Sequence, residues 1–265
     1  MANDRTEQDA KFLNDALSKL DEWRHLPAYR LEPHVDIFFG LLLPEILEAT
    51  CGLPRNNMEV IPEFPLHKGL IVNSEDEDGD DNQSIKVDFA VFHPGPDDQG
   101  ADAQEKRVFL VELKTDNASI KAEQLERMQR ARDKGVCTLL KGVVCCARQS
   151  NSKRKYAHLI QRLNLLGCIE NFKEFNSGDL KKKQPGLAGR YREMFASPSW
   201  SDAQIELVLV YPGGDLSTGV QEVLDESPRC LKKVDFSKVV DCVDENPLTQ
   251  YLVKWAKCEA GTADP

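Results

Sequence analysis

The segment from Arg107 to Lys114 carries a glutamate and a lysine at alternate positions of an otherwise apolar run. Alternation along a β-strand predicts that Glu112 and Lys114 point to the same face, together with Val108 and Leu110. An unpaired charge is costly in a strand that should be largely buried. We therefore expect the carboxylate and the ammonium to lie side by side.

A second carboxylate is expected nearby. The segment from Ile85 to Phe92 reads as a strand whose apolar side chains share one face, with Asp88 on the opposite face. If this strand is the antiparallel neighbour of the first, Asp88 comes next to Glu112. Two carboxylates can hold Mg²⁺ or Mn²⁺ through oxygen ligands, helped by the backbone carbonyl of Leu113. Lys114 can then orient or activate a water and offset charge on a pentavalent phosphate.

This pattern also has a plain structural interpretation. Glu-x-Lys on a strand is common as a salt bridge, and taken alone it favours that interpretation over catalysis. The neighbouring elements change the balance, because an apolar strand ending in Glu-x-Lys follows a strand carrying Asp and precedes a helix from Ile120 to Arg132.

The arrangement resembles the PD-(D/E)XK nuclease superfamily, on Val87-Asp88, on Val111-Glu112-Leu113-Lys114 and on the helix that follows. The resemblance extends to Gln124, since many members carry a glutamine early in that helix, close to the metal. The match is partial. Met128 stands where such members often have tyrosine, and Val87 stands where proline usually precedes the first Asp.

The resemblance implies a restriction-endonuclease-like fold of the α/β class, with three α/β/α layers around a central mixed sheet. It implies Mg²⁺ or Mn²⁺ as cofactor, nucleic acid, most simply DNA, as substrate, and Asp88, Glu112, Lys114 and Gln124 as the catalytic residues. A further acidic ligand is often supplied by the preceding helix or the first strand. The sequence offers Glu32, Asp36, Glu45 and Glu63, of which Glu32 and Glu63 are favoured as additional metal ligands because neither lies on a solvated helix face.

The remaining elements follow from periodicity and capping signals. Before the site we expect helices at Thr6–His25 and Pro33–Thr50 and strands at Met58–Leu66, Ile85–Phe92 and Val108–Lys114. After it we expect a helix capped by Ser119 that extends towards Arg148, helices at Ser152–Leu166 and Ala188–Phe195, a strand at Gln204–Tyr211, and a helix capped by Asn246. We interpret 1–265 as a single domain with an N-terminal helical extension over 1–31 and a helical insertion over 132–200.

Charge is unevenly distributed along the chain. The net charge of −10 disfavours a generic nucleic-acid binder, yet residues 121–192 hold 17 Lys or Arg against 6 Asp or Glu. Within this segment Lys153, Arg154 and Lys155 are candidate nucleic-acid-binding residues, because positive charge near a helix N-terminus opposes the helix dipole. The acidic run from Ser74 to Asn82 is interpreted as a solvated loop.

Composition excludes several classes of protein. No apolar stretch approaches the roughly 20 residues that cross a bilayer, and the N-terminus lacks the apolar core of a secretory signal, so we expect a cytoplasmic protein with no membrane partner. The eight cysteines contain no CxxC pair and are expected to be reduced. Two functional classes remain: a metal-dependent nuclease, acting as a homodimer or with a protein partner if it cuts both strands of a duplex, and a catalytically inactive nuclease-fold protein that binds nucleic acid or protein.

Overall fold

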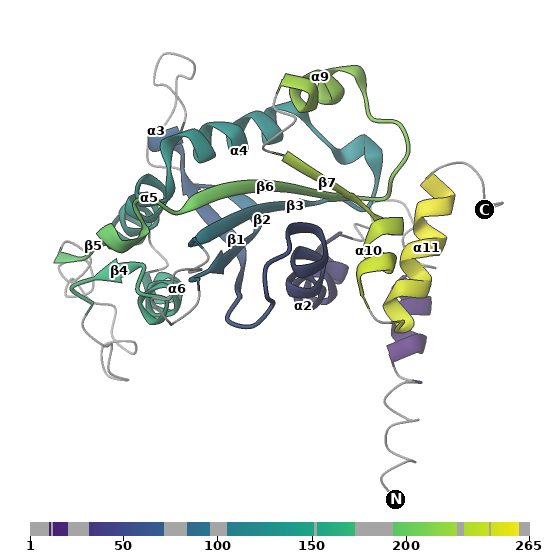
Figure 1. Cartoon of the computed structure of the whole chain (residues 1–265), viewed down its shortest axis with the longest axis horizontal. Coiled ribbons are helices and arrows are strands. Elements are labelled where there is room, and N and C mark those ends of the chain that lie inside the picture. Colours follow the sequence, from purple (N-terminus) through teal and green to yellow (C-terminus); the bar gives the residue numbers. More distant parts are fainter. Residues whose placement is uncertain are drawn as a thin grey trace, which may run out of the picture. The chain divides into compact units, whose positions relative to one another are not determined.

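A five-stranded β-sheet contains most of the strands in the computed structural model of this chain (Figure 1). The structure describes residues 11, 13–20, 32–71, 84–95, 105–150, 153–172, 193–226, 231–243 and 245–259. The strand order is β1-β2-β3-β6-β7, with bounds β1 Glu59–His67, β2 Ser84–His93, β3 Arg107–Leu113, β6 Gln204–Tyr211 and β7 Leu231–Asp235. A separate two-stranded sheet pairs β4 Ile169–Glu170 with β5 Phe195–Ala196.

The large sheet is mixed. Strands β1 and β2 pair antiparallel, with Glu59 opposite Phe92 and His67 opposite Ser84. Strands β3 and β6 run in the same direction, because Gln204 N donates to Lys106 O at 3.1 Å and Lys114 N donates to Val210 O at 2.8 Å. The expectation of an α/β protein with a mixed sheet is confirmed, whereas the restriction-endonuclease-like arrangement stays a prediction.

Helices precede, separate and follow these strands. They are α2 Glu32–Cys51, α3 Lys68–Ile71, α4 Ala122–Lys134, α5 Val136–Gln149, α6 Lys153–Leu165, α9 Thr218–Glu226, α10 Phe236–Cys242 and α11 Pro247–Glu259, with short 3-10 helices η1 Asn117–Ser119 and η2 Pro198–Trp200. Residues 13–20 are also helical, inside the first predicted helix, whose ends lie outside the described residues. The predicted cap of α11 is present, since Asn246 Oδ1 accepts from Leu248 N at 3.0 Å.

Three sequence predictions were wrong in detail. The helix expected from Ser119 towards Arg148 is two helices, because Gly135 adopts φ 78 and ends α4 before α5 begins. Ser119 does not cap α4; it closes η1, whose own cap is Asp116. Phe195, the last residue of the helix expected at Ala188–Phe195, lies in β5. The short elements β7, α9 and α10 were not predicted, because each is too short for a periodic signal.

The described residues fall into two compact units. Unit 1 comprises Met1–Asn56, Val111–Ala122 and Val208–Pro265, and unit 2 comprises Asn57–Leu110 and Glu123–Leu207. Strands β3 and β6 each begin in unit 2 and end in unit 1. Because the two units share these strands, they need not be separate domains, and the single-domain interpretation stays a prediction.

Unit 1 has its own apolar core. The rings of Phe39 in α2 and Phe236 in α10 lie 5.5 Å apart between centroids. Trp255 of α11 is fully buried, and its ring centroid lies 6.2 Å from that of Tyr251. Aromatic packing of this kind fixes α2, α10 and α11 around the apolar side chains of the unit.

Unit 2 is built around Phe92 at the end of β2. Its ring lies 5.7 Å from that of Phe64 in β1 and 5.6 Å from that of Trp200 in η2. The ammonium of Lys106 lies 5.1 Å from the Trp200 ring centroid, a distance at which cation–π attraction operates. Helix α5 packs against β1 in this unit.

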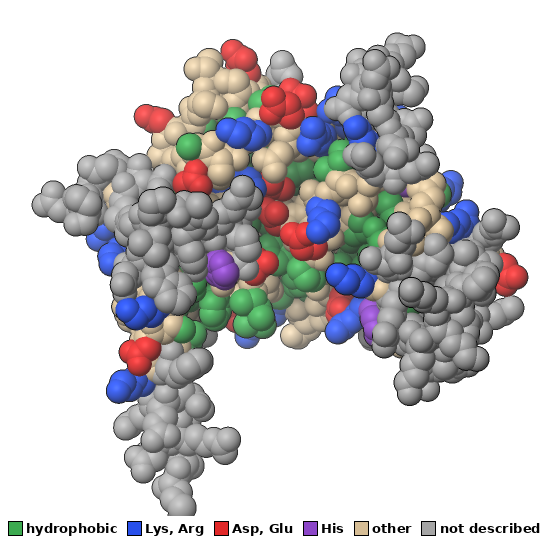
Figure 2. All heavy atoms as spheres, turned by 180° about the vertical axis from the view of Figure 1, so that it is seen from behind, with side chains coloured by type: hydrophobic (Ala, Val, Ile, Leu, Met, Phe, Trp, Pro, Cys, Tyr) green, Lys and Arg blue, Asp and Glu red, His purple; other side chains and the backbone are tan. Residues whose placement is uncertain are grey.

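The surface of the described residues carries both charge signs. On the face that Figure 2 shows, Lys and Arg side chains are interspersed with Asp and Glu side chains. Of the helices in the described part of the chain, none combines the length and apolar character needed to cross a bilayer. The acidic run 74–82 and the lysines at 181–183 lie outside the described residues.

Candidate active site

A buried glutamate–lysine pair lies at the carboxyl end of β3. Glu112 Oε1 is 2.7 Å from Lys114 Nζ, and the two side chains are 4% and 5% exposed respectively. Strand alternation accounts for their shared face, since the residues are two positions apart. The strand neighbours Val111 and Leu113, which point to the opposite face, are also buried. Both faces of the strand end are thus shielded from water, and the pair is a buried pair of charges.

The turn after β3 holds this site in place. Lys114 N donates to Val210 O of β6, and Asn117 Nδ2 donates to Gly213 O at 2.6 Å. Gly213 adopts φ 105, a conformation that a residue with a Cβ rarely takes. The turn at Pro212-Gly213-Gly214 is thereby linked to the turn that follows Lys114. The sequence does not predict this link, because a bond between segments so distant in sequence leaves no local signal.

Asp88 and Gln124 belong to unit 2. Asp88 is half-buried in β2, and Gln124 is half-buried in the first turn of α4, one position before the buried Leu125. The structure thus brings Glu112 and Lys114 together within unit 1 and describes Asp88 and Gln124 within unit 2. Convergence of the four side chains on one metal ion stays a prediction.

Glu63 stands opposite Asp88 in the register of β1 and β2. Pro62 pairs with Phe89 and Phe64 pairs with Val87, while Glu63, the residue between, adopts φ 52 and makes no ladder pair. Its carboxylate forms an ion pair with Lys86 and is 57% exposed. A glutamate in the left-handed region is strained, and such strain is concentrated at functional positions. Glu63 thereby remains a candidate ligand on the Asp88 face of unit 2.

The other candidate carboxylates divide into two kinds. Asp36 accepts from the neighbouring Ile37 N at 2.7 Å, and Glu45 accepts from Arg55 Nη1 at 2.7 Å, so local contacts occupy both. Glu32 is the first residue of α2, and its side chain lies outside the described ones, as do those of Lys153 and Arg154. Lys155 is exposed on α6.

The donor set suits a hard divalent cation better than a soft one. Asp88, Glu112 and the Leu113 carbonyl offer only oxygen, the donor that Mg²⁺ and Mn²⁺ prefer. Among the residues the structure describes, no group of three or more His, Cys, Asp or Glu side chains could hold a metal ion. The predicted site therefore rests on two carboxylates, those of Asp88 and Glu112, and on the Leu113 carbonyl.

Two buried cysteines do not offer an alternative nucleophile at neutral pH. Cys51, Cys137, Cys145, Cys146, Cys168 and Cys242 are free thiols. Burial raises the pKa of Cys146 to about 11 and that of Cys168 to about 12. Both thiols are therefore protonated near pH 7, and a protonated thiol is a poor nucleophile.

Comparison with protein-family models, with curated proteins and with solved structures finds no match to this chain. The resemblance to PD-(D/E)XK nucleases therefore rests on the residues themselves, and the functional argument rests on the geometry of the site.

Proposed function

We propose that this chain is a metal-dependent nuclease that hydrolyses phosphodiester bonds of nucleic acid, most simply DNA. Asp88 and Glu112 would hold Mg²⁺ or Mn²⁺ together with the Leu113 carbonyl, and Lys114 would act beside them. The sheet order supports the proposal, because β2, which carries Asp88, is the neighbour of β3, which carries Glu112.

The buried Glu112–Lys114 pair is the observation that carries the proposal. Both side chains are at most 5% exposed, so both charges have lost most of their hydration. A buried ion pair adds little to stability, because well-packed apolar residues in its place are often as stable or more so. Stability alone is thus a weak reason for these two charges, whereas a hydrolytic site needs both.

Each group has a role in hydrolysis. A bound divalent cation would polarise the phosphate and lower the pKa of a water molecule. Lys114 Nζ lies 2.7 Å from the Glu112 carboxylate, where an ammonium would offset the negative charge that grows on the phosphate in the transition state. Gln124 would position the water or the phosphate through its amide.

Metal binding tests the first step. Calorimetric titration of the full chain with Mn²⁺ should show a site that Asp88→Ala removes. The matched control is Asp202→Ala, an exposed aspartate in the turn after η2, which should bind Mn²⁺ like the wild type. Absence of binding in the wild type would exclude the metal site.

Cleavage of a labelled oligonucleotide in Mg²⁺ tests the second step. Lys114→Ala should lower the rate by about 10²- to 10³-fold, the usual effect of removing one electrostatic group from a transition state. Lys233→Ala, an exposed lysine on β7, should leave it unchanged. Equal rates in the wild type and Lys114→Ala would remove Lys114 from the mechanism.

A binding module without catalysis is the second candidate. Its support is a pair of exposed apolar side chains one turn apart on α2, Ile37 at 66% and Leu41 at 73% exposure. Large contiguous apolar patches mark protein-binding surfaces, and these two side chains would belong to one. Failure to bind Mn²⁺, combined with protein binding that Leu41→Glu abolishes, would favour this function over hydrolysis.

A further inference from the structure

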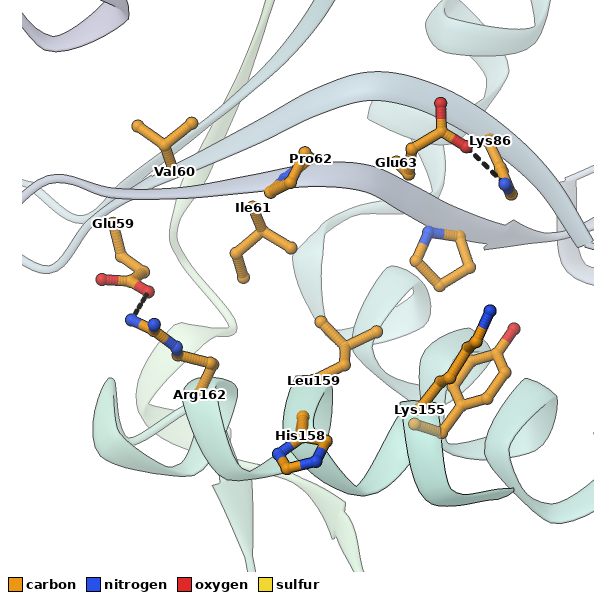
Figure 3. A pocket seen from close by; sticks show the side chains of 12 residues that line it. Glu59, Val60, Ile61, Pro62, Glu63, Lys86, Lys155, His158, Leu159 and Arg162 are labelled. Atoms are coloured by element: carbon orange, nitrogen blue, oxygen red, sulfur yellow. Dashed lines mark hydrogen bonds and ion pairs between the residues drawn. The ribbon is translucent and has the colours of Figure 1, made fainter. Parts of the chain in front are cut away.

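A pocket of about 550 Å³ lies between β1 and α6 in unit 2 (Figure 3). Side chains of β1 line one wall and side chains of α6 line the other, with Lys86 of β2 at one end. The volume falls in the usual range of small-ligand sites, roughly 300–1,000 Å³. Two residues predicted from the sequence, Glu63 and Lys155, line this pocket, whereas Asp88, Glu112, Lys114 and Gln124 do not.

The floor of the pocket is apolar. Ile61 and Pro65 are buried in β1, and Leu159 and Tyr156 are half-buried on α6. Figure 3 shows Ile61 and Leu159 pointing toward one another across the pocket. Burial raises the pKa of Tyr156, so its ring is an uncharged aromatic surface at neutral pH. Apolar and aromatic side chains of this kind accept the flat face of a nucleobase.

The rim of the pocket is charged, with a small excess of cations. Two ion pairs flank it: Glu59 with Arg162 at 2.7 Å, and Glu63 with Lys86 (Figure 3). Lys155, exposed on α6, adds a third cation against the two carboxylates. Arg162 and Lys86 neutralise the two carboxylates, and Lys155 leaves the rim with a net positive charge, which suits a phosphate.

The pocket adjoins the face of β2 that carries Asp88. Lys86 precedes Asp88 by two residues, so strand alternation puts both on one face. Glu63 stands opposite Asp88 in the register, and its ion pair with Lys86 shows that its carboxylate reaches that end of the pocket. A ligand held here would touch Lys86, on the same face of β2 as Asp88, whereas Asp88 itself is not part of the pocket lining.

We infer that this pocket receives one unpaired nucleotide of the substrate, with the base against Ile61, Leu159 and Tyr156 and a phosphate at Lys86 and Lys155. The inference rests on the proposed function and names its substrate class: single-stranded nucleic acid, or a duplex end that has frayed. Paired bases stay stacked inside a duplex, so their faces are out of reach of the pocket.

A peptide fits this wall less well. Strand β1 is an edge strand of the sheet, and peptides commonly bind such edges by adding a strand. Pro62 and Pro65 lack the N–H groups that an added strand uses, so β1 is poorly suited to that mode. The pocket is thus favoured as a site for a base rather than for an extended peptide.

Binding of a fluorescent single-stranded oligothymidylate to the full chain, followed by anisotropy in EDTA, tests the inference without metal or cleavage. Leu159→Trp fills the pocket and should weaken binding at least about fivefold, the loss of one stacked base. Its matched control is Leu165→Trp, on the same helix at an exposed position. Lys155→Ala should also weaken binding, whereas Lys141→Ala, an exposed lysine on α5, should not.

The outcomes separate this inference from the proposed nuclease activity. Unchanged oligonucleotide binding in both Leu159→Trp and Lys155→Ala would overturn the pocket inference, even if the chain binds Mn²⁺ and cleaves DNA. Weakened binding in both variants, with no Mn²⁺ site in the wild type, would retain the pocket and reject the nuclease. Tighter binding of a blunt duplex than of the single strand would overturn the inference. So would binding of an acidic, leucine-containing peptide in place of the oligonucleotide.

Discussion

Two glutamate–lysine pairs on strands of this protein differ mainly in their exposure to water. In unit 1, Glu112 and Lys114 lie 2.7 Å apart with side chains that are 4% and 5% exposed. In unit 2, Glu63 and Lys86 pair across β1 and β2 with side chains that are 57% and 59% exposed. The residue types are the same in both pairs, so their surroundings account for the difference in hydration.

The difference decides what each pair can do. The exposed pair keeps most of its hydration, and such pairs contribute about 0–1 kcal/mol to stability. The buried pair has given up its hydration, so each charge depends on its partners inside the protein. A candidate catalytic centre is therefore found by burial rather than by the Glu-Lys pattern.

The largest effect is expected from breaking the buried pair. Lys114→Met removes the ammonium 2.7 Å from the buried Glu112 carboxylate, which should lower the free energy of unfolding by about 3–5 kcal/mol. Urea denaturation at pH 7 measures this. The double variant Glu112→Leu, Lys114→Met removes both charges and should recover most of the loss. If the single variant is as stable as the wild type, the site is better hydrated than its burial indicates.

An intermediate case lies at the start of α10. Asp235, 23% exposed, accepts from Lys238 N at 3.0 Å and pairs with Lys238 Nζ at 3.8 Å. Asp235→Ala should cost about 0.5–2 kcal/mol, the usual loss of a helix cap. Thermal unfolding at pH 7 checks it, with exposed Asp215→Ala as control.

The Asp235 effect should depend on pH. Partial burial opposes ionisation, but hydrogen bonds from Ser237 and the Lys238 backbone outweigh it and hold the pKa of Asp235 below its ordinary value of 3.8. A carboxyl with a lowered folded pKa stabilises fully above its unfolded pKa and loses that contribution as the pH falls through the folded value. The stability gap between wild type and Asp235→Ala should therefore be constant near neutrality and narrow below about pH 4. A gap that widens on acidification would contradict this assignment.

Relief of strain is expected at Glu63. Glycine accepts φ 52 without the steric penalty that a side chain carries, so Glu63→Gly should raise the free energy of unfolding by up to about 1 kcal/mol. Urea denaturation measures the gain, with Glu123→Gly in α4, at an ordinary helical position, as the control that should lose stability. Loss of stability in Glu63→Gly would show that the Glu63 contacts outweigh the strain.

The smallest effect is expected from the exposed pair itself. A double-mutant cycle on Glu63→Gln and Lys86→Met should give a coupling of about 0–1 kcal/mol at low ionic strength. In 1 M salt that coupling should vanish, because screening acts on exposed charges. A coupling of several kcal/mol that survives salt would make the two pairs alike and remove the distinction between them.

Much of the secondary structure followed from local patterns. The bounds of β6 were predicted as Gln204–Tyr211 and are observed there, and α2, β1 and β2 lie within one or two residues of their predictions. Each of these elements has strong hydrophobic periodicity or is bounded by turn-forming residues. By contrast, α4 and α5 were merged because their apolar positions continue across Gly135, where only the backbone conformation marks the break.

The site was predicted less completely than the strands that carry it. Alternation correctly gave Glu112 and Lys114 a shared face, since that depends on spacing alone. The sequence does not predict the pocket between β1 and α6, although Lys155 and Glu63, which line it, are among the predicted site residues. Glu63 and Leu159 meet at one pocket only because β1 and α6 are packed in the same unit, and no local pattern encodes that packing.

The sequence by itself determined the class of fold, the course of the main strands and the chemistry available at Asp88, Glu112 and Lys114. These depend on neighbours in sequence, through hydrophobic periodicity, capping and strand alternation. Only the tertiary structure decided which charges are buried, which carboxylate is strained, and that a pocket opens between β1 and α6. Burial and cavities depend on segments distant in the chain, and the free energy of a charge is set by that surrounding rather than by its residue type.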